Sequence, residues 1–405
     1  MSFGVGSPGA GAPMTAGGLD LHTATPSVYL DQWVWFRLAK AAAGEPREPT
    51  DAAVLEAVGD ASAAGVAFPL STTHYMETSK ITDPTHRARL ARTMASVSRC
   101  RTLRSRRVLL RHQMLHAMHL AFGRPAFRPA PPEALGAGVI WAFTGKPGPL
   151  TLRGPSGRVD PATIAGMPEF LRKANQFGEF FILAGPADEE LEALRQLGYR
   201  PEVSTDVERS RLAWEQTYVG LLADDPISRA KLRVRVQARE LLHEHLDLYT
   251  ELVAEYHVNL TREIGYDPAR PHRSRKRMVA FADLIPSMRI AVDLKTELFR
   301  DAAKTWTMNA VHDIDALSMA VPYCHLVVCD AEMAHFLARS KAGQRHGTAV
   351  VPKLADLPVA LPPLVQAAQT ADGDRSGSEW ASPGDDYCVD MADLIGSAPS
   401  QSPAE

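Results

Sequence analysis

The chain has 405 residues, long enough for one large or two ordinary domains, and a formal net charge of −3 that by itself indicates no class of partner. No apolar run reaches membrane-spanning length, and the N-terminus lacks the basic and apolar regions of a secretory signal. The four widely spaced cysteines (Cys100, Cys324, Cys329 and Cys388) suit reduced thiols better than a disulfide framework, so we expect a cytoplasmic protein with no membrane partner.

The first part of the chain alternates short apolar strands with helices. A leader rich in Gly, Ala and Pro, residues 1–25, is expected to be disordered. Residues 27–31 then predict a strand that ends on Asp31, and a helix follows it. A second strand over 65–70 leads into a helix that carries Glu77. This alternation is typical of a parallel sheet.

An unusual basic segment follows. Residues 84–132 contain no Asp or Glu and eleven arginines. Arginine favours bidentate phosphate contacts, so this segment is interpreted as a polyanion-binding surface; the alternative is a solvated helix face. The arginines expected to contact phosphates here are Arg101, Arg104, Arg106 and Arg107.

Residues 125–280 predict a mainly helical insertion. Its most periodic part, 226–260, predicts one long helix with a basic beginning, which includes Arg233 and Arg235, and an acidic end. We expect the insertion to form a clamp or lid with the basic end of this helix near the functional site, so that Arg233 and Arg235 extend the nucleic-acid surface. The alternative is a packing or dimerisation module, which would make the protein a homo-oligomer.

The stretch 312–330 contains three of the acids on which the prediction of a functional site depends. It places Asp313 and Asp315 at the expected start of an apolar helix, and a short apolar segment over 326–329 then predicts a buried strand that ends on Asp330. A helix, a last strand over 348–353 and an end near residue 364 follow. Residues 365–405 have little apolar periodicity and predict a disordered acidic tail.

The acids at strand ends and helix starts form one expected constellation. The carboxyl edge of a parallel sheet is where open α/β folds place their sites. Carboxylates that meet there repel one another unless a hard cation such as Mg²⁺ or Mn²⁺ neutralises them. Two such ions could activate water and stabilise the leaving oxygen of a phosphodiester. The acids in question are Asp31, Glu77, Asp313, Asp315 and Asp330.

The segments VYLD, HYMET, HDIDALSMAVPYC and HLVVCD together resemble the PIN-like family of metal-dependent nucleases. The resemblance covers roughly residues 27–82 and 285–360. It implies a three-layer α/β/α sandwich with a mostly parallel central sheet, divided into 26–124 and 281–364 by the insertion. It also implies that Mg²⁺ or Mn²⁺ is bound by Asp31, Glu77, Asp315 and Asp330 as catalytic acids, with Asp313 as an extra or alternative ligand. Gln32, Trp33 and His325 depart from the family's pattern.

These patterns together predict a metal-dependent nuclease that hydrolyses phosphodiester bonds. The resemblance alone favours an endoribonuclease, with RNA rather than DNA as substrate. The alternative is a catalytically silent PIN-like module that binds nucleic acid or a protein. A weaker pattern, His112, His116 and His119 on one helix face, matches a transition-metal site poorly because it has no carboxylate partner, and structural or phosphate-facing histidines fit it better.

Overall fold

The computed structural model describes residues 19, 21–146, 153–154, 157–158, 177–186, 188–196, 201–224, 229–265, 269–301 and 304–375. Most of the expected disordered leader and residues 376–405 of the expected acidic tail lie outside this part of the chain. At its C-terminal end, helix α20 (Pro362–Arg375) includes the first residues of the expected tail. None of the described helices is both long and apolar enough to cross a membrane.

The fold is mixed α/β and is built around a small parallel sheet. Its strands are β1 (Val28–Leu30), β6 (Leu326–Val328) and β7 (Ala349–Val351), in the order β1-β6-β7. The register pairs Leu30 with Val328, and Val328 with Val351. All three strands therefore end at the same edge, although β1 and β6 are about 300 residues apart in the chain.

The predicted strand over 65–70 is reduced to two isolated bridges. Ala67 bridges to Ser27 beside β1, and Leu70 bridges to Thr102. Thr102 belongs to β2 (Arg101–Leu103), which pairs antiparallel with β3 (Leu135–Ala137). These contacts extend the hydrogen-bonded surface past β1, and β3 brings the beginning of the predicted insertion into it.

Side chains alternate between two hydrophobic cores along the central strands. Tyr29 and Val327 pack in one core, whereas Leu30 and Val328 pack in the other. Strands buried on both faces read as continuous apolar runs rather than as alternating ones. This explains why VYL and LVV consist only of apolar residues, each fully buried.

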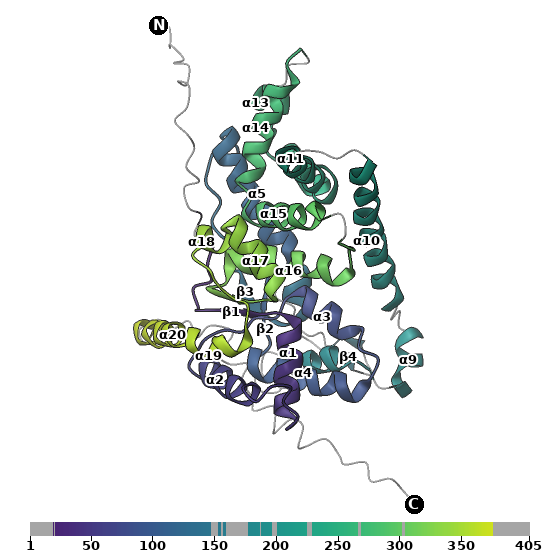
Figure 1. The fold of residues 1–405 in the computed structure, drawn as a ribbon, viewed down its shortest axis with the longest axis vertical. Helices are drawn as coiled ribbons and strands as arrows, with labels where there is room; N and C mark the ends of the chain where they lie inside the picture. The colour runs from purple at the N-terminus through teal and green to yellow at the C-terminus, as the bar shows by residue number, and fades with distance from the viewer. Residues whose placement is uncertain are drawn as a thin grey trace, which may run out of the picture.

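Helices from both ends of the chain cover one of these cores. They are α1 (Gln32–Ala42), α2 (Asp51–Ala63), α3 (Thr72–Ser79), α4 (Pro84–Ser98), α19 (Leu357–Ala360) and α20. In Figure 1, α1, α2, α4 and α19 lie below the strands, and Leu354 of η3 (Leu354–Asp356) packs in the same core.

The other core is formed mainly by helices above the strands in Figure 1. They are α5 (Arg106–Phe122), α11 (Arg229–Arg239), α12 (Leu246–Glu255), α14 (Pro271–Asp283), α15 (Pro286–Arg300), α16 (Met308–Tyr323), α17 (Ala331–Ser340) and α18 (Ala342–His346). The shorter elements outside this group are α6 (Gly138–Thr144), β4 (Arg153–Gly154), β5 (Gly157–Arg158), η1 (Asp188–Glu190), α9 (Leu191–Gln196) and α13 (Leu260–Glu263).

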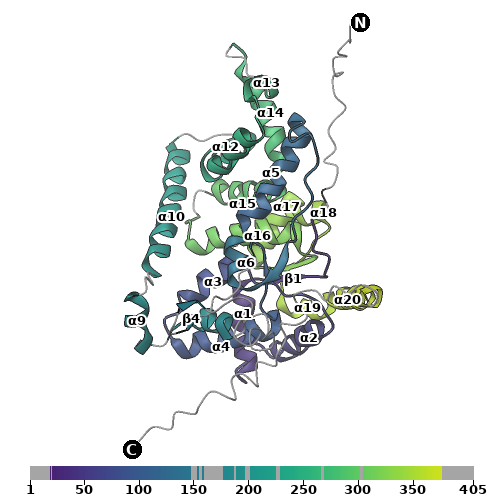
Figure 2. The ribbon, with the colours of Figure 1, turned by 180° about the vertical axis from the view of Figure 1, so that it is seen from behind.

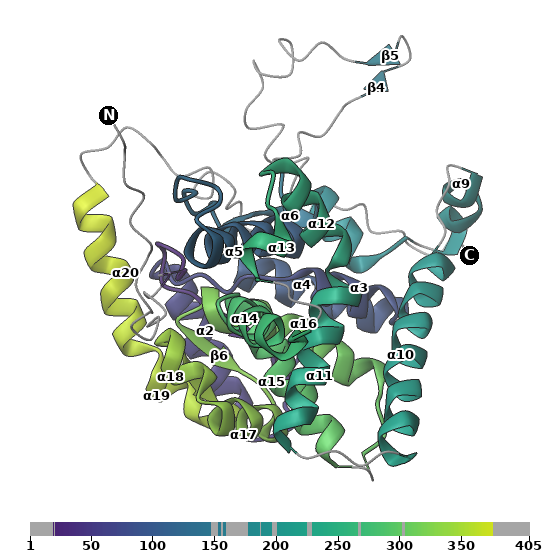
Figure 3. The ribbon, with the colours of Figure 1, turned by 90° about the horizontal axis from the view of Figure 1, so that it is seen from above.

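Helix α10 (Pro201–Asp224) is the longest helix of the predicted insertion and stands at the side of the molecule in Figures 1 and 2. Viewed from above, it lies on the opposite flank from α20 (Figure 3). It packs against α16, the helix that follows the insertion and carries Asp313 and Asp315. The insertion therefore reaches the acid-bearing helix through α10.

The single long helix expected over 226–260 is interrupted. A π-helical turn, η2 (Glu240–Glu244), follows α11, and His245 separates it from α12. The π turn is a local rearrangement of the helical hydrogen bonds. It allows Glu240 to be buried among cations, which hydrophobic periodicity does not reveal.

Candidate functional site

Two of the predicted acids directly follow neighbouring strands. Asp31 comes one residue after β1 and Asp330 two residues after β6. Each also caps the next helix: Asp31 accepts from the Gln32 N–H at 2.6 Å, and Asp330 accepts from the Met333 N–H at 2.8 Å. The parallel register therefore brings both carboxylates to the same edge, and the helix caps fix their orientation.

Glu77 is brought to this edge by helix α3. The buried His74 of this helix accepts from the Ser71 N–H through Nδ1 at 2.9 Å, and its Nε2 lies 2.9 Å from the carbonyl oxygen of Leu30 in β1. Burial lowers the pKa of His74 to about 4, so the ring is neutral and its Nε2–H donates to Leu30. His74 thus ties α3 to the strand that presents Asp31.

Helix α16 separates the two acids that the sequence analysis placed together. It begins at Met308, capped by Thr307, so Asp313 and Asp315 lie inside the helix and not at its start. Asp313 experiences the charges of Asp31, Asp330 and Glu77. Asp315 instead pairs with Arg106 at 2.5 Å and with Arg211 at 2.7 Å. The structure therefore groups Asp313, not Asp315, with the other three carboxylates.

The four grouped carboxylates repel one another. Burial raises the pKa of Asp31 to about 7, and the charges of Glu77 and Asp330 contribute, against the hydrogen bond from Gln32. Burial raises the pKa of Asp313 to about 8, and Asp31, Asp330 and Glu77 again contribute. Burial also raises the pKa of Cys329, next to Asp330, with a contribution from these carboxylates, so this thiol is not a thiolate. Burial and the neighbouring carboxylates therefore both disfavour the charged forms of Asp31 and Asp313.

This donor set fits a hard divalent cation chemically. Carboxylate oxygens are the ligands that Mg²⁺ and Mn²⁺ favour, and a cation would relieve the repulsion described above. Across the described ranges, however, no group of three or more His, Cys, Asp or Glu side chains is placed so that it could hold a metal ion. The carboxylates face a common region without converging on one point.

His312 links this edge to the insertion and has no counterpart among the predicted site residues. Its Nδ1 lies 2.8 Å from Glu77 Oε1, and its Nε2 lies 3.2 Å from Glu208 Oε1 on α10. Glu208 in turn pairs with Lys80 at 2.5 Å. His312 is only 2% exposed. Its position directly before Asp313 was the one sequence feature that could have marked it as a site residue. Its partners, Glu77 and Glu208, lie too far away in the chain to be recognised from the sequence.

Asp315 belongs to a buried network of balanced charge. Burial alone would raise its pKa, but Arg106 and Arg211 hold the pKa well below the usual range. Lys295, 5% exposed, lies 2.8 Å from both Glu215 and Glu240. The network contains the cations Arg106, Arg211, Arg239 and Lys295 and the anions Asp315, Glu215, Glu240 and Glu244.

Most arginines predicted to bind nucleic acid have internal partners. Arg106 pairs with Asp315, Arg107 pairs with Asp247 and Glu251, and Arg233 pairs with Asp283 and Asp293. Arg104 donates to the carbonyls of Gly145 and Glu133 and lies over the Trp141 ring. Arg101 and Arg235 also have interactions within the chain. The expected phosphate surface is largely neutralised, because the acids absent from residues 84–132 are supplied by distant helices.

The histidines of α5 have structural surroundings. His119 Nδ1 lies 2.9 Å from the carbonyl oxygen of Pro125, and His112 Nε2 lies 3.3 Å from that of Pro129. His116 is buried, and burial lowers its pKa to about 4, with a contribution from Arg128. These contacts hold the loop after α5 and favour the structural interpretation of the three histidines.

Comparisons with known proteins find no matching family model, no matching curated protein and no matching solved structure.

The raised pKa values of Asp31 and Asp313 predict a pH dependence of stability. An exposed aspartate titrates near pH 3.9, so these groups stabilise the fold fully below about pH 4, and this contribution is lost as the pH rises through about 7–8. In EDTA, Asp31→Asn should therefore exceed the wild type in stability by about 1–2 kcal/mol at high pH and match it at low pH. Asparagine keeps the helix cap. Urea denaturation across this range measures the difference, and parallel curves would contradict it.

The ion pairs between α5 and α12 predict small effects on stability. Arg107→Gln and Arg111→Gln should each lower the free energy of unfolding by less than about 1 kcal/mol, because both pairs are exposed. Double-mutant cycles with Asp247→Asn and Glu255→Gln measure the coupling. Neither arginine variant should change the salt dependence of oligonucleotide binding. If the arginine variants bound oligonucleotide with a flatter salt dependence and showed no coupling energy with Asp247 or Glu255, these arginines would instead be assigned to the nucleic-acid surface.

Proposed function

We propose that the protein is a metal-dependent nuclease of the PIN-like type, with its active site at the carboxyl edge of the sheet. One observation carries the proposal: Asp31, Glu77, Asp313 and Asp330 come from four separate elements, and the fold brings them near the same edge, where Asp313 experiences the charges of the other three. A structural role does not require such an arrangement, because buried acids that raise one another's pKa lower stability. Functional sites are where such groupings concentrate.

The fold supports the same assignment. The central strands bury one row of side chains in each of two helical cores, and this supports the three-layer α/β/α sandwich that the resemblance implies. The acids follow β1 and β6, at the edge where open α/β sheets bind ligands. The likeness to PIN-like nucleases therefore rests on the order of the acids and on their common edge.

The residues that would hold Mg²⁺ or Mn²⁺ are Asp31, Asp313, Asp330 and Glu77, with Asp313 in the place that the resemblance gave to Asp315. Such a cation supplies an activated water and stabilises charge on the phosphodiester oxygens. The chain itself orients the carboxylates: helix caps fix Asp31 and Asp330, and His312 fixes Glu77. RNA remains the proposed substrate through the family resemblance alone.

The decisive experiment compares two acids that are two residues apart. Asp313→Asn should abolish both the Mn²⁺-dependent rise in melting temperature and the cleavage of RNA or of single- or double-stranded DNA. Asp315→Asn should lower the free energy of unfolding by about 2–3 kcal/mol, because it removes the partner of two half-buried arginines, and should keep the Mn²⁺ response.

The two readouts separate the possible outcomes. A wild-type melting curve that does not respond to Mn²⁺ or EDTA would reject the metal site. A response to Mn²⁺ without cleavage of any substrate would instead identify the silent PIN-like module that binds nucleic acid or a protein. If Asp315→Asn, and not Asp313→Asn, removed the response, the original assignment of Asp315 as ligand would be restored.

His312 provides a further test through its hydrogen bond to Glu77. Residues that orient metal ligands contribute about 10–100-fold to metal affinity. His312→Gln should therefore weaken the Mn²⁺ affinity, measured by titration of the melting temperature, by a factor in this range. His272→Gln is the matched control, because His272 is an exposed histidine on α14. Equal Mn²⁺ affinities of the two variants would show that His312 acts only in packing.

A further inference from the structure

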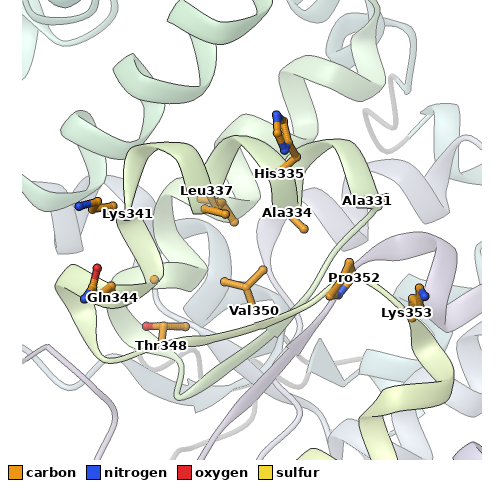
Figure 4. A pocket seen from close by; sticks show the side chains of 12 residues that line it. Ala331, Ala334, His335, Leu337, Lys341, Gln344, Thr348, Val350, Pro352 and Lys353 are labelled. Atoms are coloured by element: carbon orange, nitrogen blue, oxygen red, sulfur yellow. The ribbon is translucent and has the colours of Figure 1, made fainter.

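An open hollow lies beside the candidate site, between helix α17 and strand β7 (Figure 4). Its volume is about 570 Å³, within the range of small-ligand pockets. Val350 of β7 is partly exposed in it, and Ala334 and Leu337 of α17, both nearly buried, lie at its floor. A hollow with such an apolar floor can contact bases or riboses without reading their sequence.

The polar part of the hollow is basic. None of the 12 lining residues is an acid, and Lys341 and Lys353 lie at its opposite ends. Both lysines are exposed, and neither forms an ion pair within the described chain. They differ in this respect from Arg106, Arg107 and Arg233, whose charges are neutralised by acids of the chain.

The register fixes the position of this hollow relative to the carboxylates. Asp330 and Lys353 each lie two residues beyond a paired residue, Val328 in β6 and Val351 in β7. By register, Lys353 is level with Asp330, and Asp31 is level with Cys329. Ala331 and Lys353 line one end of the hollow, and Ala331 directly follows Asp330 in the chain.

We propose that this hollow binds a single strand of nucleic acid, with Lys353 and Lys341 contacting successive phosphates as the strand leaves the acidic edge. The inference rests on the proposed function, because it describes where the nucleic-acid substrate of the carboxylate site would lie. A single strand is favoured because it presents unpaired bases to the apolar surface, whereas a duplex offers mainly its backbone. The unpaired lysines at the two ends supply the charge complementarity.

The test measures binding by fluorescence anisotropy of a labelled oligouridine of about twelve nucleotides, a length that spans such sites. EDTA is present, so neither metal nor cleavage is needed. Each phosphate contact on a single strand contributes about 0.7 to the slope of log K against log salt. The double variant Lys341→Gln, Lys353→Gln should therefore lose about 1.4 of slope and about 25-fold in affinity near 0.1 M salt.

The matched control is Lys231→Gln, Lys276→Gln, which removes the same charge from exposed positions on α11 and α14. An equal loss in the control would reduce the effect to net charge and overturn the proposal. Two other results would also overturn it: a Lys341→Gln, Lys353→Gln variant that binds the oligouridine with wild-type affinity, or an unlabelled duplex that competes as well as the unlabelled single strand. The single variants Lys341→Gln and Lys353→Gln check that the effect does not come from misfolding. Each should lower the slope by about 0.7, half of the change in the double variant.

Failure of this inference and failure of the proposed function give different results. If the proposed function is wrong, the Mn²⁺ response and cleavage are absent in the wild type. If only the hollow is wrong, the wild type responds to Mn²⁺ and cleaves, and the lysine variant binds the oligouridine as the wild type does. The lysine variant should keep the Mn²⁺-dependent rise in melting temperature, because neither lysine belongs to the carboxylate group.

Discussion

The rotation of side chains around helix α16 governs the charge of the whole site. Consecutive residues of an α-helix are turned by about 100°, so Asp313 and Asp315 point about 200° apart. Asp315 reaches Arg106 and Arg211, whereas Asp313 faces the other acids. His312, between these directions, reaches Glu77 and Glu208. One short segment thus supplies a neutralised carboxylate, an uncompensated carboxylate and an orienting histidine.

The network around Asp315 holds the insertion against the core. It joins side chains from α5, α10, α11, η2, α15 and α16, and its four cations match its four anions. Buried ion pairs contribute little net stability compared with apolar packing, but the loss of one member is costly. The network therefore acts mainly by fixing which helices meet. Through it, and through Glu208, helix α10 has a fixed position relative to α16.

Much of the central architecture could be predicted from local sequence. Short apolar runs identified β1, β6 and β7, and the acids Asp31 and Asp330 were recognised at their ends. Glu77 was recognised on a helix after the second extended segment. These features depend on residues that are neighbours in the chain. For this reason periodicity and turn position were sufficient to locate them.

The remaining features depend on contacts across long stretches of sequence. The choice between Asp313 and Asp315 is decided by Arg211, which lies 104 residues away. The basic segment is neutralised by Asp247, Glu251 and Glu255, which lie 140 or more residues away. Composition showed an excess of arginine but could not show its partners. The basic beginning of the long helix likewise has distant partners: Arg233 pairs with Asp283 and Asp293, and α11 packs against α14 and α15.

The same charges link the cation to the substrate. In their charged forms, Asp31, Asp313, Asp330 and Glu77 would repel any phosphate that approached the edge, and Lys353, two residues beyond the paired Val351, offers one positive charge there. A divalent cation among these acids reduces that repulsion, so it must favour the binding of a nucleic-acid strand in the adjacent hollow. Linkage requires the strand to favour the cation by the same factor. In the proposed enzyme, cation and strand would therefore each strengthen the binding of the other.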